Sequence, residues 1–331
     1  MHILVTGATG FIGSHLCRAL NRAGHHVTAF VRPSSNRSIL KDLPIDYAVG
    51  DLLQADSLRK AMRGIEVVYH CGGLVARWAE PHAMIASHIE GTARVVQAAL
   101  SSGVRRFIYT SSVAALGVPS VRPKSQELIP LLDETHQWNY DVEIWPYGYG
   151  KHMAEQEVLA ALGKGMQAII LNPSAVFGAG DVHRADTGIV ARLSRRGLPV
   201  TVPGGVNVVH IDDVVQGHTA ALTLGQSGER YILGGHNLTH REMMTTIAKQ
   251  AGTTPPLLTI PLGLVRPVAR LVLWMRRSEA INLRAEMLQL AGYYFHYDIS
   301  KAQKTFNLGD PRSFSSAVKE LLTWLRETRP K

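Results

Sequence analysis

A tyrosine and a lysine stand four residues apart in this chain, at Tyr147 and Lys151, directly after Pro146. Proline suits the first turn of a helix, and a separation of four places both side chains on one helical face. A lysine ammonium beside a phenol lowers the cost of the phenolate, so the phenol can titrate below its ordinary pKa of about 10. It can then protonate a carbonyl or deprotonate an alcohol. Tyr149 is only two residues from Lys151, so it is turned away from the lysine. The alternative interpretation is that Tyr147 and Lys151 are an incidental pair on a helix surface.

Near the start of the chain, three glycines follow the spacing G-x-x-G-x-x-G, at Gly7, Gly10 and Gly13. They come directly after the apolar run at 3–5 and open a segment of helical periodicity. Glycine lets the backbone turn sharply and approach a phosphate, and the amides at a helix start donate to an anion. The order of strand, turn and helix predicts a loop that holds a dinucleotide pyrophosphate. A plain structural turn is the alternative.

Three hydroxyl groups follow a predicted strand, at Thr110, Ser111 and Ser112. In a parallel sheet the carboxyl ends of the strands form the edge where ligands bind. A serine at that edge can hydrogen-bond the same carbonyl oxygen that Tyr147 protonates. A serine-rich strand end is weak evidence by itself, but the glycine loop, a serine and the Tyr-x-x-x-Lys spacing in this order form a strong combined signal.

The second predicted strand ends in Arg32, which lies 19 residues beyond Gly13. An acidic residue near this offset binds the ribose hydroxyls of NAD and repels a 2′-phosphate, whereas a guanidinium can bind that phosphate. The sequence therefore predicts a preference for NADP, with NAD still possible and Arg37 as a possible second contact. The alternative is a solvated surface arginine.

Short apolar runs alternate with helix-period segments through the first half of the chain. The strands are expected near 2–6, 26–31, 45–49, 66–70, 105–110 and 167–172, and the helices near 11–23, 55–63, 82–102 and 147–163. This alternation predicts an α/β fold with a doubly wound parallel sheet covered on both faces. We expect a Rossmann domain over 1–172 and a smaller, mainly substrate-binding lobe over 173–331, with segments around 206–233 returning to the sheet.

Composition narrows the possible partners. The net charge is +9, but the basic residues are scattered and not interleaved with aromatic ones, so we expect no nucleic-acid partner. The first predicted strand begins at His2, which favours a chain without a signal peptide, and no apolar run approaches the roughly 20 residues that span a bilayer. Cys17 and Cys71 lack C-x-x-C spacing. Together these features favour a cytoplasmic protein with free thiols. The segment 264–277 has the periodicity of a basic amphipathic helix, which permits peripheral membrane contact without stable anchoring.

No metal site is expected. His236 and His240 have the spacing of a helical metal pair, but Thr239 and Glu242 form a predicted capping box at the start of a helix. That cap places His236 outside the helix, so the two imidazoles would not share a face.

On these motifs the chain resembles the extended short-chain dehydrogenase/reductase superfamily over essentially its whole length. It is most similar to the dihydroflavonol-reductase-like group, and also to hopanoid-associated sugar epimerases around 109–114 and 229–235. The resemblance implies the catalytic triad Ser112, Tyr147 and Lys151, and a homodimer through the helices near 82–102 and 147–163. It implies a cofactor site built from Thr6, Gly7, Thr9, Gly10, Phe11, Ile12, Gly13, Asp51, Leu52, Cys71, Gly72, Tyr147, Lys151, Asn172, Pro173 and Ser174.

Three positions depart from the family pattern. His88 stands where the family usually has an active-site asparagine, and Gly150 stands before the lysine where serine is frequent. The stretch 71–73, Cys-Gly-Gly, replaces a small alanine-containing segment on the nicotinamide side. These departures bear on substrate geometry and leave the triad intact.

Two enzymatic reactions and one non-enzymatic role remain open. The first is NADP-dependent reduction of a ketone or aldehyde on a small-molecule substrate, favoured by Arg32 and by an expected aromatic wall at Trp78, Trp138, Tyr140 and Trp145. The second is epimerisation of a nucleotide sugar with retained NAD, for which Arg77, Arg184 and Arg192 could bind a diphosphate. The third is a non-catalytic sensor of NADPH, against which the intact triad argues.

Overall fold

The computed structural model describes residues 1–73, 81–123, 129–142, 145–182, 188–265, 267 and 290–328. A seven-stranded parallel sheet takes six strands from residues 2–173 and one later strand, in the order β10-β6-β5-β4-β1-β2-β3. These strands are β1 (His2–Thr6), β2 (His26–Val31), β3 (Asp46–Val49), β4 (Val67–His70), β5 (Arg106–Thr110), β6 (Gln167–Pro173) and β10 (Arg230–Leu233). The predicted doubly wound parallel sheet is confirmed.

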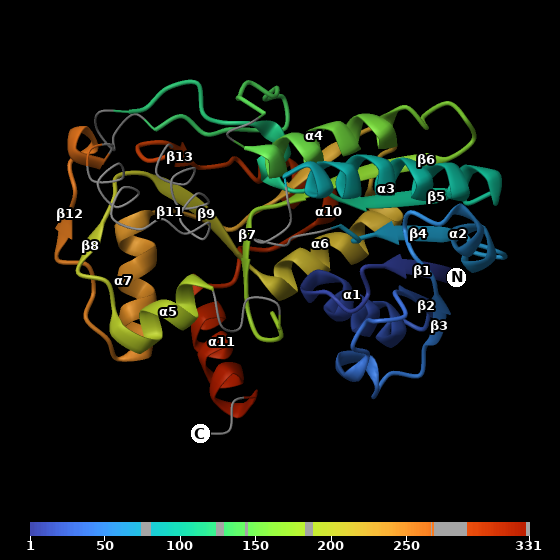
Figure 1. Ribbon diagram of the computed structural model, residues 1–331, viewed down its shortest axis with the longest axis horizontal. Coiled ribbons are helices and arrows are strands. Elements are labelled where there is room, and N and C mark those ends of the chain that lie inside the picture. The colour runs from blue at the N-terminus through green and yellow to red at the C-terminus, as the bar shows by residue number, and fades with distance from the viewer. Residues whose placement is uncertain are drawn as a thin grey trace.

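Helices cover both faces of this sheet (Figure 1). One face carries α1 (Phe11–Arg22), α6 (Ile211–Leu224) and α10 (Ser300–Phe306), and the other carries α2 (Ala55–Ala61), α3 (Pro81–Ser101) and α4 (Pro146–Leu159). Ile3 and Val5 of β1 face the first layer, and Leu4 between them faces the second. Apolar runs without alternation are therefore required in the inner strands, because these are buried on both sides.

The predicted elements match the observed ones to within a few residues. The largest difference is α4, which ends at Leu159 and not near 163. The chain then passes through turns to Gly163 and Gly165, whose φ angles of 78° and 89° no helix accepts. These two glycines prevent the helix from continuing through 163–165.

A second lobe packs beside the carboxyl edge of the sheet. At its centre β9 (Gly205–His210) pairs antiparallel with β11 (His236–Thr239) and parallel with β7 (Ala175–Phe177) and β13 (Tyr294–Phe295). Around it lie α5 (Ile189–Arg196), α7 (His240–Ala251) and α11 (Phe314–Thr328), which share one apolar core with β9 (Figure 1). A two-stranded ribbon of β8 (Val200–Thr201) and β12 (Leu258–Thr259) forms the outer edge of the lobe.

The capping box predicted for α7 is confirmed. The Thr239 hydroxyl accepts from the Glu242 amide, and the Glu242 carboxylate accepts from the Thr239 amide. His236 accordingly lies in β11 and outside the helix. Cys17 and Cys71 are free thiols. Within the described ranges, no helix has the length and apolarity needed to cross a bilayer, and most of the segment 264–277 lies outside those ranges.

Candidate active site

The glycine loop is a tight turn between β1 and α1 in which side chains have no room. Gly7 has a φ of 65°, and a Cβ there would lie 2.7 Å from the carbonyl of Cys71. A Cβ on Gly13 would overlap the Gly7 carbonyl oxygen. Two of the three glycines are therefore fixed by close backbone approach, and the loop packs directly against the segment that follows β4.

The start of α1 is suited to an anion. Gly10 is the N-cap and offers no side-chain cap, and the first turn contains no acidic residue. The amides of Phe11, Ile12 and Gly13 therefore stand at the positive end of the helix with no carboxylate competing for them. This donor set fits a pyrophosphate, as the glycine spacing predicts.

Thr6, at the end of β1, connects the glycine loop to the segment that follows β4. Its buried hydroxyl accepts from the Gly72 amide and shares a hydrogen bond with Nδ1 of His70, at 2.7 Å. The other ring nitrogen of His70 lies 3.1 Å from the Thr92 hydroxyl. Burial lowers the pKa of His70 to about 3, so the ring is neutral. Thr6 thus acts on the predicted cofactor site through the Cys71–Gly72 backbone.

The two serines after β5 have different environments. Ser111 is buried and donates to Oε1 of Glu155 at 2.6 Å, whereas Ser112 is half-buried and its hydroxyl accepts from the Ala114 amide at 3.2 Å. Among the described residues, none receives the Ser112 hydroxyl proton. Of the two, Ser112 is therefore the serine whose hydroxyl proton is available to a substrate oxygen.

A buried polar cluster fixes this serine loop. Asn172, at the end of β6, donates to the Ser112 carbonyl at 2.9 Å and to Oε1 of Glu155 at 2.6 Å. Arg230 lies 3.5 Å from the other carboxylate oxygen of Glu155. Burial raises the pKa of Glu155, while Arg230 opposes that rise. The Asn172 side chain thus faces inward and supports the serine loop; Pro173 and Ser174, which follow it, are also buried.

Lys151 is buried on α4 beside the end of β5. Its ammonium donates to the Thr110 carbonyl at 2.9 Å and to the Tyr109 hydroxyl at 3.4 Å. Burial lowers the pKa of Lys151 to about 8, because the charged form loses its hydration. The lysine is still mostly protonated at neutral pH, and it is held rigidly on the helical face that it shares with Tyr147.

Tyr147 lies in the first turn of α4, close to the serine loop, because a glycine lets the helix approach. A Cβ on Gly148 would lie 2.8 Å from the Ala114 carbonyl and 2.8 Å from the Trp138 ring. The turn η2 (Val113–Leu116), which begins after Ser112, therefore packs directly on α4. Tyr149 instead lies against Trp138, with ring centroids 6.0 Å apart, and so points away from Lys151 as expected.

The departures from the family pattern meet at one place. The His88 ring is buried and edge-on to Tyr147, with centroids 5.6 Å apart and planes at 77°. A Cβ on Gly73 would lie 2.7 Å from this ring, and one on Gly150 would lie 3.4 Å from the Cβ of His88. Gly73 thus leaves room that the imidazole occupies, whereas a side chain at Gly150 would make only a van der Waals contact with His88. Sequence reasoning noted the three residues separately and missed their contact.

Cys71 ends a chain of hydrogen bonds at the sheet edge. Nδ1 of His218 lies 2.7 Å from the Val214 carbonyl, which can only accept, so this nitrogen carries the proton. Nε2 of His218 then accepts from Thr110, and Thr110 accepts from the Cys71 thiol at 3.1 Å. Burial raises the pKa of Cys71 to about 11. The thiol is thus a protonated donor with no nucleophilic character at neutral pH.

An aromatic cluster lies next to the start of α4. Trp145 contacts Trp138, Tyr140 and Phe295, with ring centroids 6.2, 6.3 and 5.7 Å apart. Trp138 also stacks on His152. Trp138, Tyr140 and Trp145 were predicted from the sequence as part of an aromatic wall. Phe295 was not, because it comes from β13, about 150 residues later in the chain. Trp78, Arg77 and Arg184 lie outside the described residues.

The predicted adenine side of the site is open. Arg32 is exposed at the end of β2, and no described residue holds its guanidinium. Arg37 lies over the Tyr47 ring at 5.3 Å, which makes it less available for a ligand. Asp51 forms a local turn by accepting from the Leu53 amide, and Leu52 packs over Gly72.

His15 of α1 forms a hydrogen bond with the Ala179 carbonyl, which connects α1 to the segment after β7. This contact was not predicted from the sequence.

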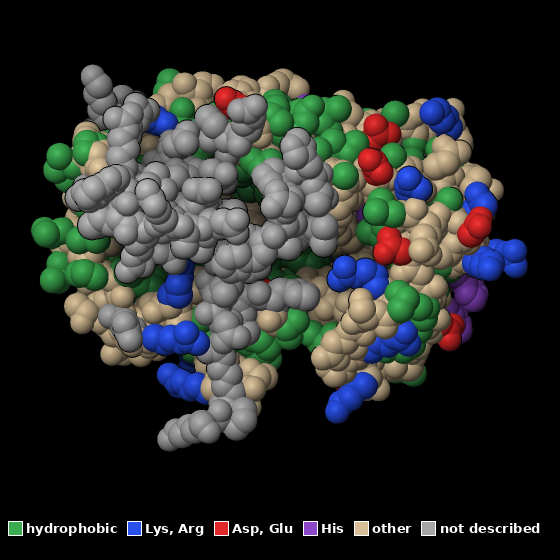
Figure 2. Space-filling model, viewed as in Figure 1, with side chains coloured by type: hydrophobic (Ala, Val, Ile, Leu, Met, Phe, Trp, Pro, Cys, Tyr) green, Lys and Arg blue, Asp and Glu red, His purple; other side chains and the backbone are tan. Residues whose placement is uncertain are grey.

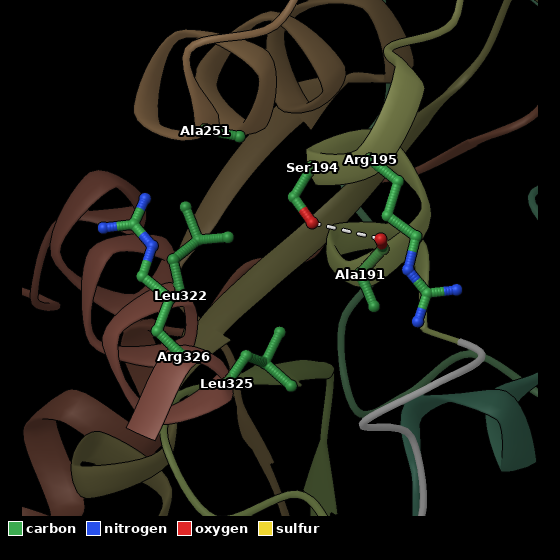
Figure 3. A pocket seen from close by; sticks show the side chains of 7 residues that line it. All are labelled: Ala191, Ser194, Arg195, Ala251, Leu322, Leu325 and Arg326. Atoms are coloured by element: carbon green, nitrogen blue, oxygen red, sulfur yellow. Dashed lines mark hydrogen bonds between the residues drawn. The ribbon is translucent and has the colours of Figure 1, made fainter. Parts of the chain in front are cut away.

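A cavity in the second lobe is separate from this site. It has a volume of about 250 Å³ and lies between α5, α7 and α11 (Figure 3). It is lined by Ala191, Ser194, Arg195, Ala251, Leu322, Leu325 and Arg326. None of the predicted catalytic or cofactor-binding residues takes part in it.

Known proteins are similar to the chain over its full length. The NAD dependent epimerase/dehydratase family matches residues 3–234. A dihydroflavonol 4-reductase-like protein of Synechocystis sp. is 33% identical, over 97% of this chain and 94% of that protein. Sterol demethylase protein B of Methylococcus capsulatus is 29% identical, over 99% of each. The crystal structure of gox2253 superposes with a TM-score of 0.84, at 35% identity and over 98% of each chain.

Proposed function

Because the chain belongs to the NAD dependent epimerase/dehydratase family and is an NAD(P)-dependent enzyme of the oxidoreductase or epimerase type, we propose that it reduces a ketone or aldehyde with NADPH. The substrate is a small apolar or ring-shaped molecule. The observation that carries this proposal is the aromatic cluster of Trp138, Trp145 and Phe295 beside the helix that bears Tyr147 and Lys151. Aromatic walls of this kind bind apolar rings.

The name of one relative supports a reductase. That relative is named as a dihydroflavonol 4-reductase, and the other as a sterol demethylase protein, and both names refer to ring-shaped molecules. The exposed guanidinium of Arg32 supports NADP, because it can bind a 2′-phosphate with charge-assisted hydrogen bonds.

In the proposed reaction the bound nicotinamide supplies the hydride, and this chain's residues handle the carbonyl oxygen. Ser112 donates its free hydroxyl proton in a hydrogen bond to that oxygen, which stabilises the developing negative charge. Tyr147 transfers its phenolic proton to the same oxygen. Lys151, still protonated at neutral pH, favours the phenolate that results and offers its ammonium to the cofactor's ribose. The buried cluster around Glu155 keeps the serine loop in position.

The first test is Tyr147→Phe, assayed by NADPH oxidation with a panel of cyclic and long-chain ketones. We expect turnover to fall by about 10²- to 10⁴-fold, the usual range for loss of a general acid, with NADPH affinity nearly unchanged. Tyr149→Phe is the matched control and should keep full activity, because that ring packs on Trp138. If Tyr147→Phe changed no turnover on any carbonyl or nucleotide sugar while NADPH still bound, the chain would be a nucleotide sensor.

The second test addresses the cofactor. Arg32→Asp removes a cation and adds an anion where the 2′-phosphate would lie. A lost charge-assisted hydrogen bond is worth about 1.5–3 kcal/mol, so the ratio of NADPH to NADH affinity should fall by about tenfold to a hundredfold. An unchanged ratio would remove the case for NADP.

Nucleotide-sugar epimerisation is the alternative, and the family name includes it. An epimerase retains NAD through its catalytic cycle, whereas a reductase exchanges its cofactor at each turnover. Denaturing freshly purified protein and identifying the released nucleotide separates the two. Stoichiometric NAD would favour the epimerase, and an empty site that exchanges NADP would favour the reductase.

A further inference from the structure

Apolar side chains gather at the outer edge of the second lobe, on the ribbon of β8 and β12. Val200 and Leu258 are in register across the ribbon, and they are 39% and 67% exposed. Exposed leucines flank both strands. We call the six side chains Leu198, Val200, Leu257, Leu258, Leu262 and Leu264 the ribbon patch. Figure 2 shows apolar side chains at this left-hand edge of the molecule. Single exposed leucines are ordinary on protein surfaces, whereas six exposed apolar side chains on one short ribbon and within five residues of it are not.

The sequence around the ribbon patch carries only one sign of charge. Residues 188–211 and 243–278 contain no aspartate or glutamate. They contain eight basic residues, which are Arg192, Arg195, Arg196, Lys249, Arg266, Arg270, Arg276 and Arg277. Figure 2 shows Lys and Arg side chains directly below the apolar edge.

The described cations lie on the helices that lead into the ribbon. Arg192 and Arg195 are exposed on α5, which runs into β8, and Lys249 is exposed near the end of α7. Arg195 forms one side of the cavity between α5, α7 and α11, and Arg326 lies on the opposite side (Figure 3). Arg241, at the start of α7, donates to the Leu257 carbonyl. The acidic residue of α7, Glu242, is engaged in the capping box.

We propose that the ribbon patch docks on the surface of a lipid bilayer that contains anionic headgroups. Leucines at the tip of a ribbon can enter the boundary between headgroups and acyl chains, and the cations behind them are attracted to the negative surface. A protein partner with an apolar groove would not require the one-sided charge. This docking is independent of the proposed reduction, since the ribbon patch contains none of the catalytic residues. It would place the enzyme where apolar ring-shaped molecules partition.

The test is cosedimentation of the purified full-length protein with vesicles. Vesicles of phosphatidylcholine alone are compared with vesicles that also contain a quarter of phosphatidylglycerol, at low and high salt. We expect binding to the anionic vesicles, and weaker binding to the neutral vesicles or at high salt. The double variant Leu257→Asp, Leu258→Asp should reduce the affinity by about tenfold or more. Leu224→Asp, at the end of α6, replaces a leucine that is 41% exposed and lies away from the ribbon, and should bind like the unchanged protein.

Circular dichroism and NADPH binding check that each variant is folded. The proposal is overturned if the unchanged protein fails to bind anionic vesicles, or if the double variant binds them equally well. It is also overturned if the ribbon variant abolishes self-association in the absence of lipid without affecting vesicle binding, since the ribbon patch would then be an interface between two copies of the chain. Reductase activity on a water-soluble ketone should be the same in the double variant, so failure of docking and failure of the proposed function are distinguishable.

Discussion

The residue with the most consequential environment is Lys151. It is almost completely buried, yet its ammonium donates to the Thr110 carbonyl and the Tyr109 hydroxyl. These two acceptors are neutral, so they compensate only part of the hydration that burial removes. The pKa accordingly falls to about 8. The charge on which the proposed chemistry depends is therefore present at neutral pH and lost within the range of ordinary buffers.

This environment predicts a pH dependence of cofactor affinity. The lysine is protonated below its pKa of about 8 and neutral above it, so the affinity of the free enzyme for NADPH should be constant near pH 7 and weaken as the pH rises beyond about 8. Fluorescence titration with NADPH at a series of pH values between about 6.5 and 9.5, which bracket that pKa, measures the dissociation constant. Lys151→Met, which has no charge to lose, should bind less tightly and show no such decline. A parallel decline in both proteins would assign it to another group.

The predicted triad residues could be selected from the sequence because of their order and spacing, and their catalytic role stays a prediction. Their support could not be identified in this way. Glu155 and Asn172 stabilise the Ser112 loop through buried hydrogen bonds between segments that are 17 to 60 residues apart. The contact of His88 with Tyr147 depends on glycines in two other segments. Sequence periodicity reports which face a residue occupies, but not which residue of another element it meets.

At the scale of elements, the distance between α4 and the turn η2 positions the site. Gly148 allows this approach, because its missing side chain leaves room for the Ala114 carbonyl and the Trp138 ring. Gly150 lies two residues further along α4, and a Cβ there would make only a tight van der Waals contact with His88. The two glycines of one helix thus have different tolerances for a side chain.

We expect Gly148→Ala to lower the free energy of unfolding by about 1–3 kcal/mol, the usual cost of overpacking, and to lower kcat by shifting Tyr147 from the serine loop. Gly150→Ala is the matched control. It should leave the free energy of unfolding unchanged or raise it by up to about 1 kcal/mol, because alanine favours a helix interior over glycine. Urea unfolding and steady-state kinetics of both variants measure these effects. Equal effects of the two substitutions would show that the close approach at Gly148 is unimportant.

The elements of the parallel sheet were predictable, and those of the second sheet were not. The inner strands of the first sheet are apolar runs buried on both faces, as at Ile3, Leu4 and Val5. β7, β11 and β13 have two to four residues, and all pair with β9, so no periodicity develops in them. The start of α7 was predicted correctly because a capping box is a local signal that needs no partner. The aromatic contribution of Phe295 depends on β13 and was missed for the same reason as the strand.

At the scale of the whole molecule, the second lobe must be held at a fixed position on the sheet, since substrate and cofactor would meet between them. Polar contacts at the start of α6 provide one such connection. Asp213 accepts from the Arg312 amide at 2.8 Å and from its guanidinium at 2.7 Å, just before α11 begins. His210, at the end of β9, donates to Glu320 of α11 at 3.0 Å. α6 covers the parallel sheet, and α11 belongs to the core of the second lobe, so the Asp213 contacts join the two parts, whereas the His210 contact lies within the second lobe.

Loss of the Asp213 contacts should loosen α11 without unfolding the sheet. The Arg312 side chain is 47% exposed, so solvent weakens its ion pair, and Asp213→Ala should lower the free energy of unfolding by only about 1 kcal/mol. Hydrogen exchange should reveal more, as faster exchange of the α11 amides with β1 and β4 unaffected. Asp212→Ala is the matched control, because that carboxylate is 3.8 Å from Arg312 and more exposed, and should have little effect on either measurement. If the sheet amides exchanged faster together with those of α11, the two parts would unfold as one unit, and the Asp213 contacts would not act locally on α11.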